Sequence, residues 1–102
     1  MRRVVITGFG IVSCIGNNKK EVLDSLLNTK SGIVFSEEHK KYNFRSHVVG
    51  NVKNLNLSEH IDRKQLRFMG DGSAYNFIAL KEAIEESGLK EKDISNEKTG
   101  IV

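Results

Sequence analysis

The sequence predicts an α/β fold that forms an incomplete part of a larger layered structure, and three observations support this prediction. Residues 3–12 (RVVITGFGIV) are rich in β-branched side chains and apolar on both faces, as in a strand buried within a layered sheet. Helical spacing of apolar residues follows after residue 18 and again after residue 62. A further apolar run, typical of a strand, begins at Thr99. Together these segments describe an α/β unit whose sheet is not closed.

The first strand and the first helix are expected between residues 3 and 32. Gly8 and Gly10 lack side chains, which lets another backbone approach the strand closely. Asn18 and Glu21 have the spacing of a helix cap and its reciprocal partner. Gly32 suits a left-handed residue after the end of this helix. The helix carries one apolar stripe, which consists of Val22, Leu23, Leu26 and Leu27.

The later elements are less regular. Residues 36–42 are polar and predict a loop, whereas residues 44–52 predict a short strand. A helical period runs from residue 62 to a good helix end at residues 87–89, with an interruption by two glycines. Because each glycine costs up to about 1 kcal/mol relative to alanine in a helix, either one helix survives or two helices abut. In the second case Asp71 or Ser73 would cap the later helix.

Composition excludes several classes of protein. The chain has 102 residues, about the size of one small domain, with an ordinary globular share of apolar (38%) and charged (28%) residues. Its net charge of +3 permits an acidic partner without the concentrated basic face that is typical of nucleic-acid binders. A single cysteine excludes a disulfide framework, and we expect a reducing cytoplasm. No stretch approaches the ~18 apolar residues of a transmembrane helix.

Gly8 and Gly10 also invite a dinucleotide-binding interpretation. That motif needs a third glycine at position 13, which is Ser13, and an acidic residue after a second strand, which is missing. A phosphate-binding loop fits no better, because Asn17 follows Gly16 where that motif needs lysine. We favour a buried strand whose glycines allow close packing.

Cys14 has three interpretations. Residues 11–14 (IVSC) are similar to a bacterial lipoprotein cleavage box, but the apolar stretch before them is short and interrupted by glycines. A nucleophilic cysteine would need a nearby base or cationic surroundings. The favoured interpretation is a small buried residue after the first strand. Three histidines share no helix or strand period, so no metal site is expected and they are interpreted as surface or hydrogen-bonded residues: His39, His47 and His60.

A basic cluster begins the second helical region. On a helix, Arg63 and Arg67 are four residues apart and share a face, and Lys64 lies one step around. Leu66 and Met69 can then turn inward. Two interpretations stay open from these residues alone: a solvated charged face, or a docking patch for an acidic protein. Such a patch would govern encounter and orientation more than final affinity, because exposed ion pairs contribute only ~0.2–1 kcal/mol each.

Taken together, these segments resemble the start of a bacterial β-ketoacyl-acyl-carrier-protein synthase of the type I condensing class. The similarity runs along almost the whole chain, and the order and spacing of the pieces are specific even where each piece alone is weak. The pattern DRKxxRFM at residues 62–69 is the most specific. The matching pieces are RRVVITGFGIVSCIGNN, LLNTKSGI, FRSHVVGNV, IDRKQLRFMGDGSAYNF and EAIEESGL.

The resemblance implies a fold, an activity and a partner. Members have a thiolase-like fold of layered helices and sheets, work as homodimers and elongate acyl chains by decarboxylative Claisen condensation with malonyl-acyl carrier protein. Their nucleophilic cysteine and two histidines lie far beyond residue 102, and no cofactor or metal is implied, so no catalytic residue carries over to this chain. Arg63, Lys64 and Arg67 match positions that receive the acidic recognition helix of acyl carrier protein.

The leading hypothesis is therefore that residues 1–102 are an N-terminal fragment of the synthase N-terminal domain, inactive alone and cytoplasmic, with no nucleic-acid or membrane partner. Two alternatives remain. One is a non-catalytic module that binds acyl carrier protein through the same basic cluster. The other is a small lipoprotein lipidated at Cys14.

Overall fold

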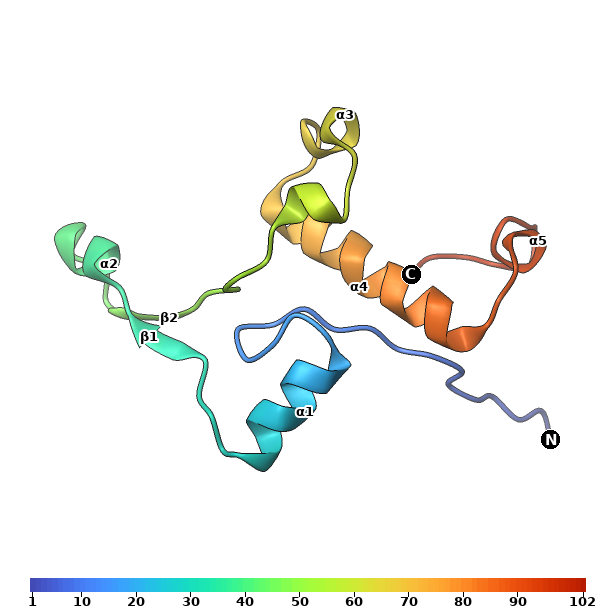
Figure 1. Cartoon of the computed structure of the whole chain (residues 1–102), viewed down its shortest axis with the longest axis horizontal. Helices are drawn as coiled ribbons and strands as arrows, with labels where there is room; N and C mark the ends of the chain where they lie inside the picture. Colours follow the sequence, from blue (N-terminus) through green and yellow to red (C-terminus); the bar gives the residue numbers. More distant parts are fainter.

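The computed structural model describes all residues, 1–102, as an open arrangement of short elements around one longer helix (Figure 1). Its radius of gyration is 17.1 Å, compared with about 13 Å for a compact domain of about 100 residues. Only 6 of the 102 residues are buried. The elements in chain order are α1 (Lys19–Leu27), β1 (Ile33–Phe35), α2 (Glu37–Lys41), β2 (Val48–Gly50), the 3-10 helix η1 (Leu57–Glu59), α3 (Arg63–Leu66), α4 (Asp71–Ser87) and α5 (Glu91–Ile94).

The N-terminal segment is extended, but it forms no strand. The expected strand over residues 3–12 is absent because no neighbouring strand offers the backbone partners that a sheet requires. The expectation of close packing at its glycines is confirmed. A Cβ atom added at Gly8 would lie 2.8 Å from the backbone nitrogen of Ser87, and one added at Gly10 would lie 3.0 Å from the Cβ atom of Glu82. The segment therefore lies directly against the backbone of α4.

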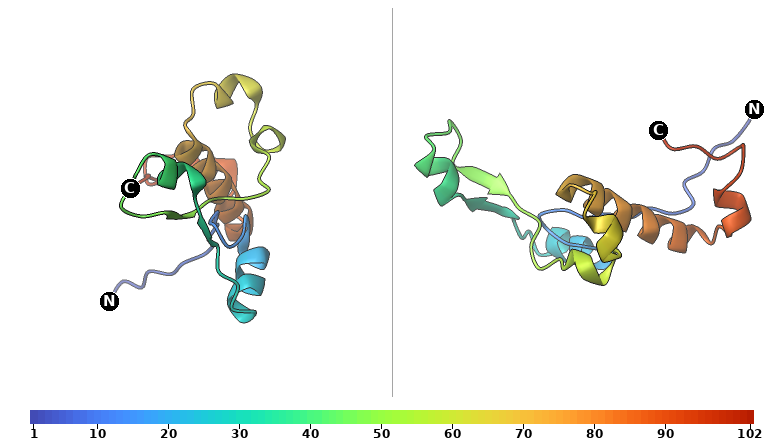
Figure 2. Two further views of the ribbon diagram at one scale, coloured as in Figure 1. Left: turned by 90° about the vertical axis from the view of Figure 1, so that its left-hand side faces the viewer. Right: turned by 90° about the horizontal axis from the view of Figure 1, so that it is seen from above.

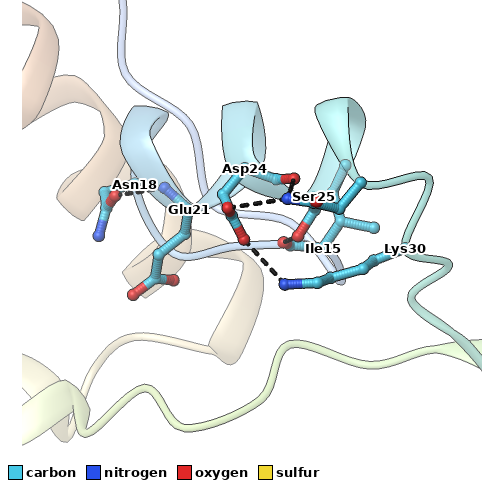
Figure 3. Close-up of polar contacts among 7 residues, drawn as sticks. Ile15, Asn18, Glu21, Asp24, Ser25 and Lys30 are labelled. Atoms are coloured by element: carbon cyan, nitrogen blue, oxygen red, sulfur yellow. Dashed lines mark hydrogen bonds and ion pairs between the residues drawn. The ribbon is translucent and has the colours of Figure 1, made fainter.

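Helix α1 begins as expected and ends early (Figure 3). The Asn18 side chain accepts a hydrogen bond from the backbone N–H of Glu21 at 3.0 Å, which satisfies a donor that the first turn leaves free. The Glu21 carboxylate accepts from the backbone N–H of Asn17 (2.7 Å) instead of that of Asn18. Beyond Leu27 the left-handed residue is Thr29, with φ 52°, and not Gly32 as expected.

Helix α1 is tied to the preceding segment by a polar contact and not by its apolar stripe. The Ser25 hydroxyl is buried and donates to the carbonyl of Ile15 at 2.6 Å. Of the predicted stripe, Val22 is buried, and the others are exposed: Leu23, Leu26 and Leu27. The stripe therefore presents apolar surface that no other part of this chain covers.

Strands β1 and β2 form an antiparallel pair in which Val34 lies opposite Val49. The short strand expected within residues 44–52 is confirmed as β2, while β1 was not expected. The prediction of a loop over residues 36–42 is wrong, because Glu37–Lys41 form α2. The Ser36 hydroxyl caps this helix by accepting a hydrogen bond from the backbone N–H of His39. Figure 2 shows this hairpin extending away from α4.

The long helical region divides into two helices, one of the two outcomes expected. Helix α4 starts after Gly70, and no side chain caps it, so the expected capping by Asp71 or Ser73 is wrong. Asp71 instead lies in the first turn, where a negative charge favours the helix dipole. The expected end is confirmed by Gly88, whose φ of 69° is left-handed.

The last residues contain one unexpected short helix, α5, and residues 98–102 form no strand. A small apolar cluster of Ile61, Ala74 and Ile78 forms the core and holds η1, α3 and α4 together. None of the helices combines the length and apolar character needed to cross a bilayer. The chain thus has the helices and short strands of a mixed α and β segment, without a layered sheet of its own.

Candidate basic docking surface

The three predicted docking residues come together on one short element. Arg63 and Lys64 lie in α3, and Arg67 is the residue that ends it; we call these three residues the basic patch. The helix has four residues, and a helix of that length is not stable in isolation. It is held in place because Leu66 and Met69 pack against the core cluster, which confirms the expectation that they turn inward.

The basic patch is exposed, and its charges are not neutralised by this chain. All three side chains are exposed and, with Leu66, line a shallow depression of about 470 Å³. The structure contains two ion pairs, Lys19 with Glu86 and Lys30 with Asp24, and neither involves the patch. Figure 1 shows α3 at the top of the molecule, away from the N-terminus and α5.

This arrangement suits recognition of an acidic surface. Two guanidinium groups offer forked donors to carboxylates, and an ammonium group adds a third positive charge. Positive charges that lack partners in the chain create a field that speeds encounter with an anionic partner. No cysteine, histidine or carboxylate lines the depression, so the surface can bind and orient a partner without contributing a nucleophile or a base.

The other candidate residues lie elsewhere. Cys14 is half-buried. A Cβ atom added at Gly32 would collide with its sulfur (2.7 Å), and one added at Gly50 would contact it tightly (3.1 Å). This close packing supports its interpretation as a small packed residue. Cys14 lines a small surface depression, and no histidine lines the same depression.

Two of the histidines, His39 and His47, lie in the β1–β2 hairpin, and His60 lies at the end of η1. His39 Nδ1 is 3.2 Å from the carbonyl of Ser46, and its ring packs against Phe44. His47 meets the edge of Phe35 at a ring-centroid distance of 6.0 Å. His60 is exposed at the end of η1.

Sequence reasoning missed a pair of carboxylates on α4 that joins three segments. Glu82 accepts hydrogen bonds from the backbone N–H groups of Ile11 (3.0 Å) and Lys19 (3.1 Å). Glu86 accepts from the backbone N–H of Phe9 (2.8 Å) and pairs with the Lys19 ammonium. Hydrogen bonds from Lys19 and from the Phe9 backbone lower the pKa of Glu86.

We call Glu82 and Glu86 the carboxylate clamp. Their spacing of four residues places both on one face of α4, and this spacing was the signal available in the sequence. Their partners could not be found there, because all of them lie more than 60 residues away in the sequence. The clamp gives the N-terminal segment hydrogen-bond acceptors that a neighbouring strand would otherwise supply.

Comparisons with known proteins agree with the resemblance. Residues 1–102 match the family model for the β-ketoacyl synthase N-terminal domain. The chain is 60% identical over 102 residues to 3-oxoacyl-[acyl-carrier-protein] synthase 1 of Haemophilus influenzae and 52% identical over 103 residues to that of Escherichia coli; each match covers 100% of this chain and 25% of the relative. A synthase 2 of Staphylococcus aureus is 33% identical over 98% of the chain and 24% of its own length.

The chain therefore spans about a quarter of the length of these curated relatives. The match extends along all of its residues and includes the region of the basic patch and the carboxylate clamp. The chain belongs to the β-ketoacyl synthase family and is homologous to the N-terminal part of 3-oxoacyl-acyl-carrier-protein synthase 1.

Proposed function

We propose that these residues act within a 3-oxoacyl-acyl-carrier-protein synthase and that the basic patch receives the acyl carrier protein. The observation that carries the proposal is the patch itself: Arg63, Lys64 and Arg67 are exposed on an anchored helix and have no ionic partner in the chain. The names of the relatives specify a carrier protein as the bearer of the acyl group. An acidic recognition helix on that carrier complements three clustered cations.

The reaction that this docking serves is the extension of an acyl chain by decarboxylative condensation with malonyl-carrier protein. The nucleophilic cysteine and the two histidines of that reaction belong to the three quarters of the synthase that these residues do not include. Neither Cys14 nor any of the three histidines lies on the basic patch. The contribution of residues 1–102 is to bring the carrier to the enzyme and to orient it.

The proposal also covers the fold, the cellular location and the oligomeric state of the protein in which residues 1–102 act. We infer that residues 1–102 form part of the N-terminal domain of a thiolase-like layered fold, in a cytoplasmic homodimer. The absence of a sheet neighbour for residues 3–12 supports this inference, because a β-branched segment that exposes Val4 and Ile6 needs partners to become a strand. The exposed leucines of α1 likewise need a covering layer.

A free-standing module that binds the carrier through the same patch is the second candidate, and the exposed patch alone is equally consistent with it. Such a module must fold independently. With 6 of 102 residues buried, the chain has little apolar burial to offset the conformational entropy that is lost on folding. The synthase proposal is therefore favoured.

A hybrid enzyme tests the proposal directly. Residues 1–102 would replace the matching quarter of the Haemophilus influenzae relative, with which they share 60% identity. We expect the hybrid synthase to fold and to condense acyl- and malonyl-carrier proteins, with the unsubstituted relative as the reference. A folded hybrid without condensing activity, or a hybrid that does not fold, would contradict the proposal.

The hybrid synthase also tests the carboxylate clamp through its pH dependence. Because the pKa of Glu86 is lowered in the folded chain, its charged form stabilises the fold above the ordinary glutamate value of 4.5, and this stabilisation is lost as the pH falls through the folded pKa. Glu86→Gln is therefore expected to lower the thermal midpoint at pH 7, and the deficit should close in acid. Thermal unfolding measures both, at pH 7 and at a pH low enough to protonate Glu86 in the folded chain.

Glu85→Gln is the matched control, because Glu85 is exposed on the same helix and forms no ion pair. It should change the midpoint little at either pH. An equal deficit for Glu86→Gln at both pH values would show that the loss comes from replacing an acceptor oxygen by an amide N–H group and not from the missing charge.

A further inference from the structure

Phe68 is an exposed aromatic side chain next to the basic patch. It directly follows Arg67 and is 91% exposed, while its apolar neighbours in sequence, Leu66 and Met69, pack against the core cluster. Among the large apolar residues, only those near the two chain ends are exposed to a similar or greater extent. Phe68 is therefore presented outward by a segment whose other apolar residues are used for packing.

The turn that carries Phe68 is well held. The backbone N–H of Phe68 donates to the carbonyl of Gln65 at 3.0 Å, and the N–H of Met69 donates to the carbonyl of Leu66 at 3.2 Å. Both hydrogen bonds extend α3 by a further tight turn before α4 begins at Asp71. An aromatic side chain on such a turn loses little conformational freedom when it enters an interface.

The charges around Phe68 indicate what covers it. Phe68 directly follows Arg67 in the chain. Another part of the synthase that buried Phe68 would therefore come close to the charge of Arg67, and a charge taken out of water needs an acidic partner. A separate acidic protein provides those partners when it docks and leaves the cations solvated when it departs. Recognition surfaces of this kind are enriched in aromatic residues and arginine, with an apolar centre and a polar rim.

We propose that Phe68 is the apolar anchor of the carrier-protein docking surface and that it contacts an apolar side chain on the acidic recognition surface of the carrier. This inference rests on the proposed function and adds a specificity element to it. The three cations attract and orient the carrier, and Phe68 slows its dissociation. An acidic protein without an apolar residue at the matching position would meet the same charges and bind more weakly.

The test compares Phe68→Ala with Phe68→Leu in the hybrid synthase, using malonyl-carrier protein and a small malonyl thioester as alternative substrates. Phe68→Ala is expected to raise KM for the carrier substrate about five- to thirtyfold, the effect of losing a central interface side chain. KM for the small thioester and the thermal midpoint should not move, and Phe68→Leu should retain most of the affinity. Phe44→Ala removes a ring of the same kind from the hairpin, where it is 52% exposed, and serves as the control.

Salt separates the apolar anchor from the cations. The penalty of Phe68→Ala should be the same at low and high ionic strength, whereas the penalty of Arg67→Glu should shrink as salt screens the charges. A fall in the thermal midpoint of Phe68→Ala would show that the synthase itself covers this ring and would overturn the inference. An unchanged KM for the carrier, or equal losses with both substrates, would also overturn it.

The two proposals fail separately. If Arg67→Glu impairs only the carrier substrate and Phe68→Ala impairs neither, the basic patch remains the docking surface and Phe68 is not its anchor. If neither variant discriminates between the two substrates, the docking proposal itself is wrong.

Discussion

Replacing Arg67 with glutamate in the hybrid synthase is expected to lower kcat/KM for carrier-protein substrates about ten- to a hundredfold at low ionic strength, within the range of electrostatic steering. The change reverses one of three uncompensated charges on an exposed helix. It removes attraction for an acidic carrier and adds repulsion. Activity with small thioester analogues should be nearly unaffected, because they reach the catalytic residues without docking.

The measurement is steady-state kinetics with both substrate types across a range of salt concentrations. Arg45→Glu is the matched control: it makes the same charge change at an exposed position before β2, on the hairpin that extends away from α3. The Arg67 effect should weaken as the Debye length shortens. Equal losses with carrier and small substrates would rule out a docking role for Arg67.

The basic patch was open to prediction because its geometry is local. Arg63 and Arg67 share a helix face through their four-residue spacing, and the same period sends Leu66 inward to the core cluster. What the residues alone left open was the meaning of the exposed charges. A solvated face and a docking surface have the same sequence pattern, and only the resemblance and the missing ionic partners favour docking.

Other local features followed the same rule. The Asn18 cap and the helix end at residues 87–89 depend on atoms within a few residues, and both are confirmed. The prediction of a loop over residues 36–42 was wrong for a local reason as well. The stretch is polar, and the helix cap that Ser36 provides was not recognised in it. The left-handed residue after α1 was misplaced, since Thr29 adopts that conformation three positions before Gly32.

Elements that depend on distant partners were not predictable in this way. A β-branched run such as residues 3–12 indicates a strand, but a strand exists only where neighbouring strands pair with it. In this chain no strand pairs with residues 3–12. The carboxylate of Glu82 accepts a hydrogen bond from the backbone N–H of Ile11 instead, and that of Glu86 accepts one from the backbone N–H of Phe9. The pattern correctly predicted close packing of the glycines against α4. The predicted burial is wrong for this chain, because Val4, Val5 and Ile6 are exposed where no neighbouring strand or layer covers them.

The contact between the N-terminal segment and α4 leads to the second large prediction, that Gly10→Val strongly destabilises the hybrid synthase. A Cβ atom at position 10 would lie 2.7 Å from the carbonyl carbon of Ala79 and 3.0 Å from the Cβ atom of Glu82, and backbone atoms of a helix cannot move aside cheaply. Valine must therefore push the segment off α4 and break the hydrogen bond from Ile11 to Glu82. We expect a loss of about 3 kcal/mol or more in the free energy of unfolding, at the upper end of overpacking costs.

Thermal and denaturant unfolding of the hybrid synthase measure this loss, and Gly72→Ala is the control that separates a collision from a general intolerance of larger residues. Gly72 lies within α4, its φ is not left-handed, and an added Cβ atom would have no neighbour within 4 Å. Alanine there should stabilise the helix by about 0.5–1 kcal/mol. If Gly10→Val leaves the unfolding midpoint unchanged, the N-terminal segment does not lie against α4 in the folded synthase. If both variants destabilise alike, the close approach at Gly10 is not the cause.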